Sequence, residues 1–78
     1  MILEKVIKQA SEKLKFSNID SHELDSEIIL SNLMGVTREF LITNNNLDIS
    51  KNIVKKYNFS IKRRANKEPV AYIIGTKE

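Results

Sequence analysis

Apolar residues return at helical spacing along most of the chain, and no stretch alternates between apolar and polar residues as a half-buried strand would. Only two glycines and one proline are present to make tight turns, and 78 residues allow a single domain. The sequence therefore predicts an all-α fold, a small bundle of about five helices, two of them short. The apolar side of the first helix, over residues 2–15, consists of Ile2, Leu3, Val6, Ile7, Ala10 and Leu14.

The second helix is predicted to begin at residue 20 or 21, where Asp20 and Glu23 have the spacing of a capping box. We expect it to end at Gly35, because glycine readily adopts the left-handed conformation found at helix ends. Most sides of this helix are apolar, which is typical of a helix at the centre of a bundle. Asp25 lies on an apolar side, so we expect its carboxylate to be partly buried.

The remaining helices are bounded by clear signals. Thr37 is the predicted N-cap of a short helix, which ends at the asparagine run 44–46. A longer helix is predicted over residues 50–66, and Pro69 suits the first turn of a last short helix, residues 70–74. The buried stripe of the longer helix is predicted to be Ile53, Val54, Tyr57, Ile61 and Ala65.

Residue types that carry catalysis are nearly absent. The chain has no cysteine and one histidine, His22, which we expect at the surface of the second helix and which has no companion ligand for a metal. Glu23, Asp25 and Glu27 do not share one helix face, so they are not a pair of catalytic carboxylates. No glycine-rich phosphate loop is present. We therefore expect no catalytic, cofactor-binding or metal-binding residue in this segment.

The segment also lacks membrane and export signals. Its longest apolar run is the five residues 70–74, far short of the roughly 20 that a membrane span requires. The N-terminus has neither the basic start nor the apolar stretch of a signal peptide. We expect a cytoplasmic protein without a membrane partner.

Charge is unevenly distributed along the chain. Residues 1–50 hold five Lys and Arg against eight Asp and Glu, whereas residues 51–78 hold eight against two. A basic segment of this kind is compatible with nucleic acid, an acidic protein surface, a neighbouring domain or a merely solvated helix face. The order helix, Gly35, short helix imitates a helix-turn-helix, but the second helix offers only Arg38, beside an acid, for reading bases. This arrangement argues against nucleic acid as the partner.

One aromatic residue lies on the polar side of the longer helix. Phe59 faces away from the buried stripe and has Lys55, Lys62 and Arg63 beside it. An aromatic side chain among cations can dock a protein partner or stack on a base, although another segment of a small bundle could instead cover it. We predict a partner or interdomain surface made of Lys55, Phe59, Lys62 and Arg63.

Arg64 has the opposite placement, because it lies on the inward side of the same helix as Tyr57. A buried guanidinium requires an anionic partner. The available acids are Asp25 and Glu68, so we predict a structural polar pair between Arg64 and one of them.

A longer pattern resembles a known family. The run Arg63-Arg64-x-x-x-Glu68-Pro69-x-Ala71-Tyr72-Ile73-Ile74-Gly75 is similar to the end of the N-terminal helical domain of the HemK/PrmC family, the release-factor glutamine methyltransferases. The segments 24–30 and 35–38 also resemble that domain. The likeness covers roughly residues 20–78, and the order of helices fits throughout.

The resemblance implies a division into domains. Residues 1–75 would form the N-terminal substrate-recognition domain, and residues 76–78 would begin the linker to a methyltransferase domain that binds S-adenosylmethionine. That domain would methylate the glutamine side-chain amide of the Gly-Gly-Gln motif in class I peptide chain release factors. Its Asn-Pro-Pro-Tyr motif is absent here, so no catalytic or cofactor residue is carried over. The implied partners are a release factor and the chain's own methyltransferase domain. The alternative is a free-standing basic helical module that binds nucleic acid or serves as a protein adaptor.

Overall fold

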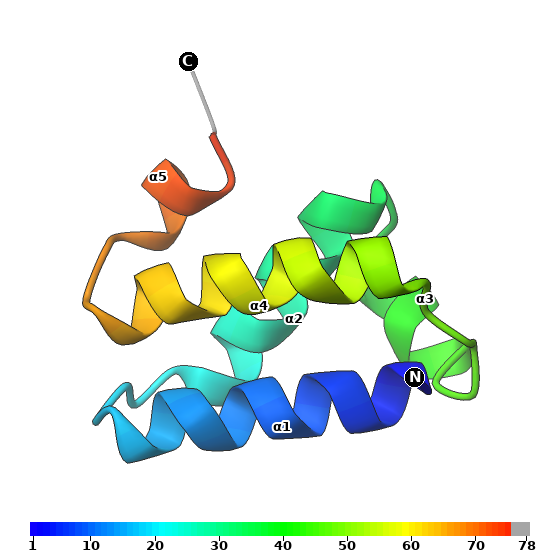
Figure 1. Cartoon of the computed structure of the whole chain (residues 1–78), viewed down its shortest axis with the longest axis horizontal. Helices are drawn as coiled ribbons and strands as arrows, with labels where there is room; N and C mark the ends of the chain where they lie inside the picture. The colour runs from blue at the N-terminus through cyan, green and yellow to red at the C-terminus, as the bar shows by residue number, and fades with distance from the viewer. Residues whose placement is uncertain (76–78) are drawn as a thin grey trace.

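Helix α2 (His22–Met34) lies at the centre of the molecule and contacts all four other helices of the computed structural model, which describes residues 1–75 (Figure 1). The predicted all-α fold is confirmed: five helices follow one another in the described part of the chain, and two of them are short. The predicted linker at residues 76–78 lies outside the described residues. The helices are α1 (Leu3–Phe16), α2, α3 (Arg38–Thr43), α4 (Lys51–Ala65) and α5 (Val70–Ile73).

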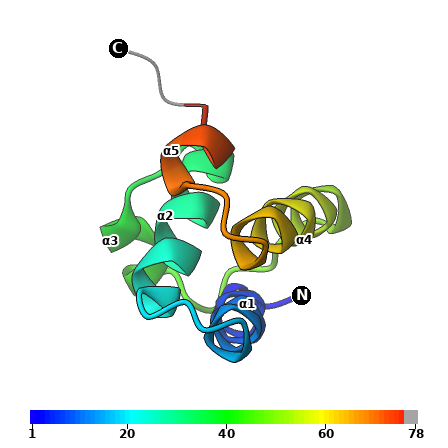
Figure 2. The same ribbon diagram turned by 90° about the vertical axis from the view of Figure 1, so that its left-hand side faces the viewer.

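Helices α1 and α4 run side by side in the same direction, with α2 packed against both (Figure 2). Their N-terminal ends meet where the Met1 ammonium donates to the Ile49 carbonyl at 3.3 Å, and their C-terminal ends meet where Lys67 Nζ donates to the Ser17 carbonyl at 2.6 Å. The only pairing of extended backbone within residues 1–75 is an isolated antiparallel bridge between Ile2 and Asp48. This bridge fixes the chain's start against the loop before α4.

The prediction for Ile2 was wrong. Its side chain is 42% exposed instead of contributing to the apolar face of α1. The reason is that Ile2 precedes the helix in extended backbone, where it pairs with Asp48, so helical periodicity does not apply to it. Leu3, the first helical residue, is buried as predicted.

The N-terminus of α2 also differs from the prediction. Ser21 occupies the N-cap position, and no side chain caps the helix there, so the capping box of Asp20 and Glu23 does not form. The Ser21 hydroxyl instead donates to Asp25 Oδ2 at 2.8 Å. The C-terminal prediction is confirmed, because Gly35 ends the helix with a left-handed φ of 71°.

The other helix ends follow the sequence signals closely. Thr37 Oγ1 accepts the backbone N–H of Phe40 at 3.1 Å, and Ser50 Oγ accepts that of Ile53 at 3.2 Å. Each hydroxyl satisfies a backbone donor that the first helical turn leaves free. Pro69 is the N-cap of α5, which begins at Val70 as predicted and ends at Ile73, one residue before the predicted end.

The core lies between α1, α2 and α4. Tyr57 of α4 is fully buried, and its hydroxyl donates to the Ser26 carbonyl of α2 at 2.8 Å. This bond satisfies the one polar atom of a large buried side chain. The buried apolar side chains are Leu3, Val6, Ala10, Leu14, Ile19, Ile29, Leu30, Leu41, Ile49, Tyr57 and Ile61.

Candidate functional site: the outer face of α4

The outer face of α4 carries an exposed aromatic among basic residues. Phe59 is 65% exposed, so within residues 1–75 no segment covers it. Lys55 and Lys62 are also exposed and lie one turn before and one turn after it on the same face. We refer to Lys55, Phe59 and Lys62 as the α4 surface. A large apolar side chain in this position can insert into a partner while the lysines contact acids around it.

Arg63 borders the α4 surface but is held by an acid of its own chain. Its Nε and Nη2 atoms donate to Glu68 Oε1 at 3.0 and 2.7 Å. The hydrogen bonds to Glu68 raise the pKa of Arg63 and lower the pKa of the Glu68 carboxyl. Arg63 therefore contributes less free positive charge to the surface than the sequence suggests.

Arg64 points inward and connects α4 to α2. Its Nε atom donates to Asp25 Oδ2 at 2.9 Å, and its Nη1 atom donates to the Glu68 backbone carbonyl at 2.9 Å. Of the two acids predicted as partners, Asp25 supplies its carboxylate, whereas the Glu68 carboxylate goes to Arg63. Asp25 is only 5% exposed and also accepts from Ser21, so its charge is well compensated.

A pocket of about 460 Å³ opens beside the α4 surface and was not among the sequence-based predictions. Met1 forms one wall, since its ammonium is anchored by Asp48 Oδ1 at 3.1 Å. Lys55 belongs to both the pocket and the α4 surface, so the two are continuous. In the sequence, only the helical spacing of Lys51, Lys55 and Asn58 points to this site. Met1 is brought to it by tertiary packing, which the sequence does not reveal. The lining residues are Met1, Lys51, Val54, Lys55 and Asn58.

A second depression, of about 570 Å³, lies between α1 and α2. His22, which was predicted at the surface, lines this depression half-buried, with its Nδ1 atom 2.8 Å from Ser11 Oγ. The hydrogen bond to α1 explains the difference, because the two helices meet at this point. The lining contains more acidic than basic residues, namely Glu4, Glu12, Glu23 and Glu27 against Lys8 and Lys15, so its net charge is opposite in sign to that of the α4 surface.

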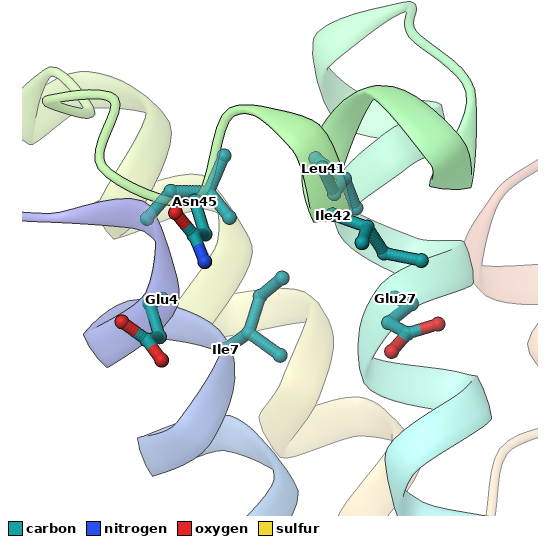
Figure 3. Close-up of a pocket in the computed structure, with 7 residues that line it drawn as sticks. Glu4, Ile7, Glu27, Leu41, Ile42 and Asn45 are labelled. Atoms are coloured by element: carbon teal, nitrogen blue, oxygen red, sulfur yellow. The ribbon is translucent and has the colours of Figure 1, made fainter.

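A smaller pocket, of about 200 Å³, lies between α1, α2 and α3 (Figure 3). Glu4 and Glu27 stand on opposite sides of it, with the side chain of Ile7 between them in this view. Glu27 is already engaged, because it accepts Arg38 Nε and Nη2 at 3.0 and 2.8 Å. The two glutamates therefore do not form a catalytic pair.

Other kinds of site have no geometric support in the part of the chain that the structure describes. Among residues 1–75, no three His, Asp or Glu side chains gather in an arrangement that could hold a metal ion. No helix in the same range is long and apolar enough to cross a membrane. The arrangement of residues is suited to contact with a partner through α4.

Comparison with known proteins gives a consistent result. A model of the family described as the PrmC N-terminal domain matches residues 5–75. The release factor glutamine methyltransferase of Buchnera aphidicola subsp. Schizaphis graminum (strain Sg) is 42% identical over 72 residues, which are 92% of this chain and 26% of that protein. The protein of that name from Clostridium botulinum (strain Hall) is 33% identical over 78 residues, 100% of this chain and 28% of that protein.

A bifunctional methyltransferase of Rickettsia felis is also similar, with 32% identity over 76 residues, 97% of this chain and 14% of that protein. The chain thus spans about a quarter of the length of the release factor glutamine methyltransferases it matches. No solved structure matches it.

Proposed function

The chain belongs to the PrmC N-terminal domain family, and we propose that it is the substrate-recognition domain of a longer methyltransferase that acts on class I peptide chain release factors. The longer protein would transfer a methyl group from S-adenosylmethionine to the glutamine side-chain amide of the Gly-Gly-Gln motif. The name of the relatives, release factor glutamine methyltransferase, supports this reaction and substrate. The catalytic and cofactor-binding residues would lie in the part of the relatives that this chain does not cover.

The observation that carries the recognition role is the exposure of Phe59 on a helix without acids. Helix α4 contains six basic residues and no acidic one, and of its two aromatic residues Tyr57 is buried whereas Phe59 is 65% exposed. Placing a large aromatic side chain in water has no benefit for the stability of this domain. Burying it against a partner contributes to binding.

The physical need for such a surface follows from the reaction. An enzyme that modifies one glutamine of a folded protein must position a large substrate to within about an ångström of the productive geometry. Contacts far from the reacting amide can supply the free energy that offsets the cost of that orientation. A rigid helical domain that binds the release factor would fulfil this role.

The proposal is tested by the double substitution Phe59→Ala and Arg63→Ala in the full-length enzyme, with methylation of a purified release factor as the measurement. We expect kcat/KM to fall about tenfold or more, because the aromatic contact is lost and the Glu68 carboxylate beside the α4 surface is left without its guanidinium partner. The matched control is Phe16→Ala with Lys13→Ala, since Phe16 is an even more exposed aromatic, on α1.

Unchanged kcat/KM in the Phe59 and Arg63 variant would contradict a recognition role for this face. A fall of the same size in the control would show that any loss of exposed aromatic and cationic groups impairs the enzyme. A full-length protein that neither binds nor methylates the release factor would overturn the proposed function and favour a nucleic acid-binding or adaptor role.

A further inference from the structure

A row of exposed residues extends the α4 surface toward the N-terminus of the chain. Lys51, Lys55, Asn58 and Lys62 follow each other at helical spacings on one side of α4. From Lys51 to Lys62 this row covers about 16 Å at 1.5 Å per residue. We propose that the row and its adjoining pocket bind an acidic peptide segment of the partner, with one aliphatic side chain of that segment inserted in the pocket.

The first argument is the charge of the row. Within residues 1–75, the salt bridges of α4 involve only Arg63 and Arg64, which pair with Glu68 and Asp25. The lysines of the row therefore form no salt bridge with a carboxylate of the described chain. Helix α4 has no acidic residue that could reduce the positive potential. Such a potential attracts a segment rich in Asp and Glu and excludes basic ones.

The second argument is the chemistry of the pocket. It is lined by Met1, Val54, Lys51, Lys55 and Asn58, and a lysine can present its aliphatic stem to an apolar group while its ammonium stays in water. Met1 remains 45% exposed, so this apolar wall faces solvent in the isolated domain. The Met1 ammonium is occupied by Asp48 and the Ile49 carbonyl, which leaves its side chain as the accessible part. A flexible methionine beside a valine is suited to an aliphatic side chain.

The same residues favour protein over nucleic acid. Single-stranded nucleic acid binding combines a long cationic groove with several stacking aromatics. Here the row spans about 16 Å, Phe59 is the only aromatic beside it, and both arginines of α4 are engaged within the chain. A short acidic peptide matches these dimensions.

This inference rests on the proposed function and specifies how the release factor is held. The experiment uses the full-length enzyme and a purified, fluorescently labelled class I release factor, with Kd measured by fluorescence anisotropy. The test variant is Lys51→Glu with Lys55→Glu, and the matched control is Lys5→Glu with Lys13→Glu, two exposed lysines of α1. A second variant, Asn58→Trp, fills the pocket without changing the charge.

We expect Kd to rise about tenfold or more for the Lys51 and Lys55 variant, mainly through slower association at low salt, and to stay within about twofold for the control. Asn58→Trp should weaken binding severalfold with an unchanged salt dependence. The bound segment is identified with release factor variants in which one cluster of Asp and Glu at a time is changed to lysine. The variant that changes the cluster in contact with the row should restore binding to the Lys51 and Lys55 variant, because both surface charges are then reversed.

Four results would overturn the inference. Equal Kd values for the test and control variants would leave the proposed function standing and remove this surface from it. Failure of every release factor variant to restore binding would contradict the acidic segment. Binding of a 12-nucleotide oligouridylate that the Lys51 and Lys55 variant abolishes, with release factor binding intact, would assign the row to nucleic acid. Absence of release factor binding by the wild-type enzyme would overturn the proposed function and this inference together.

Discussion

The Nε atom of Arg64 on α4 lies 2.9 Å from Oδ2 of Asp25 on α2, 39 residues earlier in the chain. Neither charge is free in water, because the side chains are 20% and 7% exposed. The pair therefore connects two of the three helices that surround the core, and it orients the turn toward α5 because Arg64 also donates to the Glu68 carbonyl. This contact acts together with the Tyr57 hydroxyl, which donates to the Ser26 carbonyl, in holding α4 against α2.

Arg64→Met is expected to lower the free energy of unfolding by about 3 kcal/mol, because it leaves the Asp25 carboxylate buried without its cation. Urea denaturation followed by circular dichroism measures the change. The matched control is Arg63→Met, which removes an exposed ion pair and should have a far smaller effect. The double variant Asp25→Leu with Arg64→Met should recover much of the loss, since no charge is then left buried. Equal effects of the two single substitutions would contradict the role assigned to Arg64.

Tyr57→Phe is expected to make stability less sensitive to alkaline pH. Burial raises the pKa of the Tyr57 hydroxyl well above its usual value, despite the hydrogen bond to Ser26, which lowers it. The unfolded chain can ionise this group above about pH 10 whereas the folded chain cannot, so its stabilising contribution is present below that pH and is lost as the pH rises.

The measurement is urea denaturation of both proteins between about pH 8 and pH 11, which brackets the ordinary tyrosine pKa. At the lower pH the phenylalanine variant should be less stable by about 1 kcal/mol, because the bond to the Ser26 carbonyl is lost. The difference should shrink and then reverse as the pH rises. A constant difference in the free energy of unfolding between the two proteins across this range would contradict the prediction. It would show that the Tyr57 hydroxyl ionises equally in the folded and unfolded chains.

Ser50→Ala is expected to destabilise the domain by about 1 kcal/mol, because the Ser50 hydroxyl accepts the Ile53 backbone N–H at the start of α4. The thermal midpoint of unfolding measures the loss. Asp20→Ala is the control, since the structure assigns Asp20 no capping bond even though its sequence position suggested one. A loss at Asp20 as large as that at Ser50 would show that the N-terminus of α2 is capped in solution as the sequence predicted.

Gly35→Ala is expected to cost about 1 kcal/mol, because an L-residue is strained in the left-handed conformation, with its φ of 71°. A Cβ atom at this position would meet nothing within 4 Å, so the cost comes from the backbone alone. Gly35→Asn should be milder, since asparagine tolerates this conformation better. The denaturation midpoints of the two variants distinguish backbone strain from a steric clash. A clash would destabilise the variant with the larger asparagine more than the alanine variant.

The sequence alone predicted those parts of the structure that depend on local interactions. Apolar spacing together with boundary residues located the five helices of residues 1–75, and Thr37, Ser50 and Gly35 marked ends that the structure confirms. The same reasoning failed at Ile2, where a bridge to Asp48 replaces the helix, and at Asp20, whose acid does not cap α2. At Ile2, a partner distant in sequence determines the conformation.

In the candidate site, too, one part was predicted from the sequence and another depends on tertiary contacts. Helical spacing alone placed Lys55, Phe59 and Lys62 together, because residues three and four apart share a face whatever surrounds the helix. Only the tertiary structure decided that Phe59 stays exposed, that Asp25 binds Arg64 while Glu68 binds Arg63, and that Met1 completes a pocket beside Lys55. The physical reason is that burial and pairing depend on which segments the folded chain brings into contact. The periodicity of one helix contains no information about its neighbours.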